Sequence, residues 1–170
     1  MFTLRFKPSA INHWAARNTD QTYKAFEQEI APNARSRGYL TQAEFLSLCE
    51  WKSPRSRQRC RANTPGLVEE ATRFAFQSTH ERLRIGSLLS LDGVSWPTAS
   101  VLLHFCSGDP YPILDFRALW SLRTPQPSAY NFDFWWRYVQ CCRELAERNR
   151  VSMRTLDLAL WQYSKERQPL

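Results

Sequence analysis

The sequence predicts an all-α protein: one compact multi-helix domain over residues 1–170, with at most one short strand near the N-terminus. Three observations predict this class. Apolar residues recur at helical spacing along most of the chain, and Ser or Thr repeatedly precedes such a segment as a helix N-cap would. Ten prolines against five glycines indicate many abrupt element ends and few flexible joints. With 170 residues, 43% of them hydrophobic, the chain can bury a core.

Local capping and breaking signals place the expected elements. Residues 2–6 alternate apolar and polar side chains, which is typical of a short strand or of an extended arm. Pro32 and Gly38 are expected to end the helical stretch before them. Two Thr/Ser-x-x-Glu patterns form capping boxes, in which a hydroxyl and a carboxylate satisfy orphan amides reciprocally. Helices are expected over residues 10–17, 19–30, 97–106, 115–122, 132–147 and 152–163, and three more are opened by Thr41, Thr64 and Ser78.

The charge balance favours a polyanionic partner. Lys and Arg number 23 against 16 Asp and Glu, which gives a net charge of +7. Each phosphate that such a surface neutralises also releases a condensed counterion, so nucleic acid gains most from this excess. A basic soluble protein without such a partner is the alternative, and charge alone does not decide between them.

Cysteine usage and targeting signals favour a reducing compartment. The five cysteines are odd in number, two are adjacent and no CxxC pair occurs, which argues against a disulfide framework and a four-thiolate metal site. No signal-peptide pattern and no long apolar run is present, so we expect a cytoplasmic protein without a membrane partner. The three histidines lie far apart, and no phosphate-binding or dinucleotide-binding glycine motif occurs, so neither metal nor other cofactor is expected.

Residues 88–106 predict two helices joined by a tight turn. Asp92 and Gly93 supply that turn, because glycine tolerates positive φ. Ser95 can cap the second helix, and Pro97 is tolerated in its first turn. A turn of this kind exposes backbone N–H groups beside the positive end of a helix, which favours phosphate binding.

This segment and its continuation resemble the signature of the helix-hairpin-helix DNA glycosylases, typified by endonuclease III and the adenine glycosylase acting on mismatches. The family's hairpin runs apolar-x-Gly-Val-Gly-x-x-Thr-Ala, and an apolar helix and a short loop then lead to a catalytic aspartate. Here Gly93, Val94, Thr98 and Ala99 match by type and spacing, and Asp115 stands where that aspartate would stand. The resemblance covers residues 88–117 and implies a two-lobed helical fold that acts on DNA.

Three departures from the family pattern narrow what the resemblance implies. Ser95 replaces the second glycine of the hairpin. Pro97 occupies the position of the lysine with which bifunctional members form a Schiff base, so the resemblance implies no amine-mediated strand cleavage. The four-cysteine iron–sulfur loop is absent. A minimal or non-catalytic relative is therefore the alternative.

Asp115 has two interpretations. Cleavage of an N-glycosidic bond passes through a sugar cation, and a nearby carboxylate stabilises that charge or orients the attacking water once the base has left the stack. Aspartate is also among the best N-cap residues, and Asp115 precedes the helix expected over residues 116–122. One residue can do both. The aromatic residues that follow are expected to be mostly core, with one or two left for a base pocket.

A basic run provides the second expected contact with DNA. No acid interrupts it, which favours a phosphate-tracking segment over the alternative, a solvated loop. Trp96 is expected either near the duplex or packed on the preceding helix. The expected DNA-binding residues are Gly93, Val94, Ser95, Trp96 and Thr98 in the hairpin, and Lys52, Arg55, Arg57, Arg59 and Arg61 in the basic run.

Two functions follow from these observations. The first is a monofunctional base-excision glycosylase-like hydrolase of DNA repair, with Asp115 acting on the N-glycosidic bond of a damaged or modified base. The alternative is a non-catalytic helix-hairpin-helix module that binds DNA beside a partner protein. A helical protein-interaction domain with a coincidental hairpin is the third and weakest interpretation.

Overall fold

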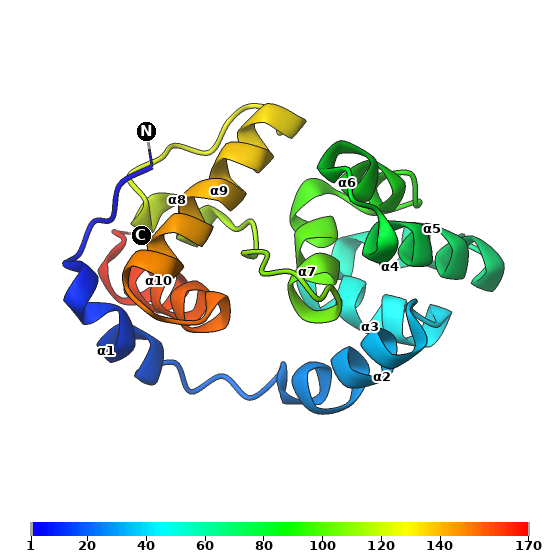
Figure 1. Cartoon of the computed structure of the whole chain (residues 1–170), viewed down its shortest axis with the longest axis horizontal. Coiled ribbons are helices and arrows are strands. Elements are labelled where there is room, and N and C mark those ends of the chain that lie inside the picture. The colour runs from blue at the N-terminus through cyan, green and yellow to red at the C-terminus, as the bar shows by residue number, and fades with distance from the viewer. Residues whose placement is uncertain (1, 170) are drawn as a thin grey trace. The chain divides into compact units, whose positions relative to one another are not determined.

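The computed structural model describes residues 2–169, and that part of the chain is helical without a β-strand (Figure 1). The all-α class is thus confirmed. No helix within residues 2–169 combines the length and apolar content needed to cross a membrane. The α-helices are α1 (Ile11–Ala16), α2 (Ala31–Arg37), α3 (Gln42–Lys52), α4 (Arg57–Arg61), α5 (Pro65–Gln77), α6 (Glu81–Leu89), α7 (Trp96–Cys106), α8 (Phe116–Ser121), α9 (Phe132–Arg148) and α10 (Met153–Arg167). The shorter turns are the 3-10 turns η1 (Pro8–Ala10) and η3 (Pro54–Ser56) and the π-helical turn η2 (Phe26–Ile30).

The chain divides into two compact units. The central unit is Gln21–Asp109 and contains α2 to α7. The terminal unit combines Met1–Asp20 with Pro110–Leu170 and contains α1 and α8 to α10. The single domain expected over residues 1–170 stays a prediction, and each unit is described by itself below.

The central unit is built around α7. Residues 98–103 of this helix are all buried, and α3 and α6 both pack against it. Helix α5 in turn packs on α6, and the two lie side by side in Figure 1. The apolar residues of α7, the second helix of the expected hairpin, therefore form the centre of this unit. Their burial fixes the position of the turn that precedes α7.

The terminal unit is built around α10. Helices α1 and α8 both pack against it (Figure 1). The N-terminal segment is an extended arm, the second of the two alternatives: the Thr3 N–H donates to the Leu122 carbonyl (3.0 Å) and the Arg5 N–H to that of Ser121 (2.9 Å). The arm therefore follows the end of α8 without forming a strand.

Of four local signals for element ends, two are wrong and two are confirmed. The helical conformation expected from residue 19 also begins later, at residue 24. The helical stretch does not end at Pro32, because the π-helical turn η2 runs directly into α2 and the prolyl residue lies in the first turn of α2. Gly38 ends α2 in a left-handed conformation, as expected. The capping box at Thr41 is complete. The one at Ser78 does not form: its hydroxyl accepts from the His80 N–H, and α6 begins without a side-chain cap.

Candidate nucleic-acid interface

The turn between α6 and α7 is fixed by Gly93. Its φ is +80°, and the residue is buried. A Cβ atom at this position would lie 2.7 Å from Cys60 Sγ and 2.8 Å from the Cys60 backbone nitrogen. Glycine is therefore required both by the backbone conformation and by the close approach of α4.

A buried asparagine joins the same turn to the end of α4. The Asn63 Nδ2 donates to the Asp92 carbonyl and to the Cys60 carbonyl, both at 2.9 Å. Its Oδ1 accepts from the Asp92 N–H, also at 2.9 Å. Both backbone groups of Asp92 are thus bonded by one side chain that is only 2% exposed. Sequence analysis missed Asn63, because its partner lies 29 residues further on and no local pattern marks it.

The start of α7 follows directly on this turn. Ser95 is the N-cap residue and is exposed, but its hydroxyl lies 3.2 Å from that of Thr98 and makes no cap bond to the helix backbone. Thr98 is buried, and Val94 and Trp96 are half-buried. Of the hairpin residues expected to bind DNA, Ser95 is the exposed one, and the exposed Asp92 precedes it by three residues.

The basic run forms η3 and α4, and the structure brings it to the turn. The Arg59 Cβ lies 3.1 Å from the position of a Cβ on Gly93. Arg55, Arg59 and Arg61 are exposed, and within residues 2–169 none of the three has an acidic partner within 4.0 Å. Arg57 differs from its neighbours, because it pairs with Glu50 of α3 at 3.0 Å.

Lys52 lies one turn earlier, at the end of α3, and is half-buried. The exposed arginines of this run without an acidic partner among residues 2–169 are Arg55, Arg59 and Arg61, and we call these three residues the arginine group. Of the three, Arg59 lies next to the Gly93 turn. They give the central unit a local excess of positive charge that no acid in the described chain neutralises by direct pairing.

Asp115 belongs to the terminal unit, at the start of α8. Its Oδ1 accepts from the Arg117 N–H at 2.9 Å, so it caps the helix, and its side chain remains half-exposed. The loop before it is held on both sides of Ile113. The buried Tyr138 hydroxyl donates to the Ile113 carbonyl (2.7 Å), and the Ile113 N–H donates to Asp157 Oδ1 (3.2 Å).

An aromatic side chain lies within electrostatic reach of Asp115. The pKa of Tyr130 is raised above its usual value, chiefly by burial and further by the negative charge of Asp115. Among the aromatic residues expected near a base pocket, the half-buried Tyr130 is thus one whose hydroxyl lies close enough to Asp115 to feel its charge. Trp135 and Tyr138 are fully buried and belong to the core.

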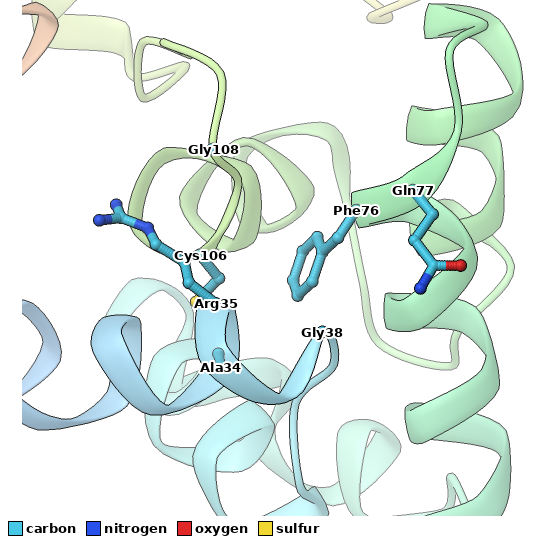
Figure 2. A pocket seen from close by; sticks show the side chains of 7 residues that line it. All are labelled: Ala34, Arg35, Gly38, Phe76, Gln77, Cys106 and Gly108. Atoms are coloured by element: carbon cyan, nitrogen blue, oxygen red, sulfur yellow. The ribbon is translucent and has the colours of Figure 1, made fainter.

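A pocket of about 270 Å³ in the central unit contains none of the predicted site residues (Figure 2). The ring of Phe76 points into it, toward Gly38 and Cys106. The only thiol in its wall is that of Cys106, and burial raises the pKa of this thiol to about 12. Arg35 donates to the Phe105 carbonyl at 2.7 Å. The pocket therefore offers no carboxylate and no activated nucleophile.

Comparison of the chain with protein-family models, with curated proteins and with solved structures gives no match. The interpretation of this interface therefore rests on its own geometry and on the local resemblance of residues 88–117.

Proposed function

We propose that the chain binds DNA through the Gly93 turn and the arginine group. We further propose that it is a monofunctional base-excision enzyme in which Asp115 acts on the N-glycosidic bond of a damaged or modified base. The contact between Gly93 and Arg59–Cys60 carries the proposal, because it brings together the hairpin turn and the basic run. Each of these two features separately suggests phosphate binding.

The physical argument for DNA binding is local. The N-terminal end of α7, where Ser95 is exposed, carries a partial positive charge that favours a phosphate oxygen. The Asp92 N–H and the Val94 N–H are already bonded, to Asn63 Oδ1 and to the Leu91 carbonyl, so the contact that we propose is with this helix end. The arginine group adds three full charges on η3 and α4, with Arg59 at the turn itself, and guanidinium groups bind phosphate in a bidentate manner. Phosphate contacts of this kind fix a protein on the duplex without selecting a base sequence.

The proposed chemistry rests on Asp115. A half-exposed carboxylate on a loop held by two buried hydrogen bonds keeps a defined position, which preorganised charge stabilisation requires. As the glycosidic bond breaks, the carboxylate would stabilise the sugar cation or accept a proton from the attacking water. Pro97 offers no amine at the lysine position of the family pattern, so we expect no covalent imine with the sugar.

Binding is tested with a fluorescent duplex oligonucleotide at several salt concentrations. Arg59→Ala and Arg61→Ala should each weaken binding and reduce the slope of log affinity against log salt by about one. Arg57→Ala should have a smaller effect, because Glu50 already neutralises this residue. Binding that ignores ionic strength and is unchanged in Arg59→Ala and Arg61→Ala would contradict the proposal.

Base release is tested on duplexes that each contain one deaminated, alkylated, oxidised or mismatched base, with abasic sites detected by strand cleavage in alkali. Asp115→Asn should lower the rate by about 10²–10³ while DNA binding is retained. Borohydride should trap no protein–DNA adduct. Full base release by Asp115→Asn would contradict the assigned role.

One observation favours a second candidate, a non-catalytic DNA-binding module. The carboxylate of Asp115 accepts the backbone N–H of Arg117, which is by itself a sufficient reason for an aspartate at this position. This candidate predicts the same salt-dependent binding and the same effect of Arg59→Ala, but no base release from any duplex of the panel.

A further inference from the structure

We propose that the terminal unit carries a second DNA contact, a stacking cluster on α8 and α10 that binds unpaired nucleotides next to Asp115. The cluster consists of Phe116, Arg117, Trp161 and Lys165. The inference deepens the proposed function and rests on it in one respect, which is that the polymer bound is DNA. No residue of the cluster belongs to the Gly93 turn or to the arginine group.

Phe116 is the anchor of the cluster. It is the first residue of α8, and 49% of its surface is exposed, whereas Ala118 and Leu119 of the same helix are buried. Helix α8 packs on α10, which supplies the half-buried Trp161. Two aromatic residues are therefore partly accessible to solvent near the start of the terminal unit's helix α8. Phe116 follows Asp115 directly in the sequence, and Trp161 lies on α10, which packs against α8.

Two cations lie over these rings. The Arg117 guanidinium carbon is 5.1 Å from the ring centre of Phe116 and 5.6 Å from that of Trp161. The Lys165 Nζ is 5.0 Å from the same Trp161 ring, one helical turn further along α10. Arg117 therefore bridges the two rings, and both cations share the indole of Trp161.

Neither cation is neutralised by an acid. Within residues 2–169, neither Arg117 nor Lys165 has a carboxylate within 4.0 Å. Other cations of the same unit are paired: Arg17 with Glu166 at 2.9 Å, and Arg154 with Asp157 at 3.2 Å. The positive charge of the cluster is thus available to an external anion.

The combination selects unpaired DNA among possible partners. The exposed ring of Phe116 can stack on a base, and the cations Arg117 and Lys165, which Trp161 holds beside it, can bind the phosphates that join such bases. A duplex conceals its base faces, and an acidic peptide would use the cations alone. Extruding one nucleotide beside Asp115 also unstacks its neighbours, which are then free to stack on Phe116.

The experiment measures binding of a fluorescent oligothymidylate to the full chain by anisotropy. Phe116→Ala should weaken binding about tenfold, and Lys165→Gln should weaken it less and lower the salt slope by about 0.7. Phe74→Ala is the matched control, because Phe74 is also 49% exposed but lies on α5 of the central unit. It should bind like the unaltered chain, and circular dichroism of each variant checks the fold.

Each outcome decides the matter. Loss in Phe116→Ala with no loss in Phe74→Ala supports the cluster. Equal binding by all variants, or competition by polyglutamate as strong as that by oligothymidylate, overturns it. If Arg59→Ala weakens duplex binding while Phe116→Ala leaves oligothymidylate binding intact, the proposed function stands and the cluster falls. If duplex binding is absent while Phe116→Ala loses oligothymidylate binding, the proposed function falls instead.

Discussion

At the scale of single residues, Gly93 is constrained by its own backbone and by its neighbour. We expect Gly93→Ala to lower the free energy of unfolding by at least about 1–3 kcal/mol, because a side chain at φ +80° is strained and also meets α4. Urea unfolding measures this. Combining it with Cys60→Ala should not restore stability, since the Cys60 backbone nitrogen at 2.8 Å remains. Full rescue would mean that only the sulfur opposes the methyl group.

Replacing Asp92 should strengthen DNA binding, whereas replacing an arginine of the arginine group should weaken it. The exposed Asp92 carboxylate is the acid of the Gly93 turn, so it would repel a phosphate bound there. Asp92→Asn keeps the backbone groups that Asn63 binds, and should tighten duplex binding about threefold or more at low salt. The gain should shrink as salt is added. Unchanged affinity at low salt would indicate that DNA does not approach this turn.

Gly93 and Asn63 show what the sequence can and cannot reveal at this scale. Gly93 was predictable, because a glycine after aspartate between two helical patterns has a local reason to be there. Asn63 was not, since its role depends on a partner brought close only by folding. The ion pair between Arg57 and Glu50 was hidden for the same reason. Local features can be predicted from the sequence, whereas contacts between residues far apart in the sequence cannot.

At the scale of elements, the loop before α8 depends on α9. The Tyr138 hydroxyl is buried and bonds the Ile113 carbonyl, so Tyr138→Phe leaves that carbonyl without this partner and should cost about 1–3 kcal/mol of stability. Tyr163→Phe is the matched control. Its hydroxyl reaches the Arg5 carbonyl at 3.4 Å from a partly exposed site, so the loss should be smaller. Equal effects in thermal unfolding would contradict the importance of the Ile113 bond.

Helix starts were mostly predictable at this scale, because a cap is a contact over three residues. Thr41, Thr64 and Ser152 each accept the backbone N–H expected of an N-cap side chain. Ser78 has the same pattern but bonds His80 instead, while Arg84 donates to the Ser78 carbonyl and holds this segment in another path. A competing local hydrogen bond here prevails over the capping pattern.

At the scale of the whole molecule, the all-α class was predictable because periodicity and caps recur along the chain. The resemblance implied two lobes, but which segments form each unit was not predictable, since residues 2–20 and 110–169 join through contacts between distant segments. The Gly93 turn of the central unit and Asp115 of the terminal unit were each identified from short sequence patterns. The remote contacts around each of them came only from the structure.

Burial of thiols makes a final prediction for the molecule as a whole. Burial raises the pKa of Cys106 from an ordinary value of 9.0 to about 12, and raises that of Cys142 as well. Above pH 9 the unfolded chain loses these protons while the folded chain keeps them. The unfolded state then binds fewer protons, so stability must fall as pH rises, by about 1.4 kcal/mol per pH unit for each such group.

The free energy of unfolding, measured by urea at neutral pH and at several values above pH 9, tests this. For Cys106 the effect is absent below pH 9, and its contribution to the slope ends near pH 12. Cys106→Ala should reduce the slope of the free energy of unfolding against pH by the contribution of about one proton, or about 1.4 kcal/mol per pH unit. This holds whatever the variant costs in stability at neutral pH. Cys141→Ala is the control, because this thiol is half-exposed and its removal should change the slope less. An identical slope in Cys106→Ala would show that the Cys106 thiol ionises as readily in the folded chain as in the unfolded one.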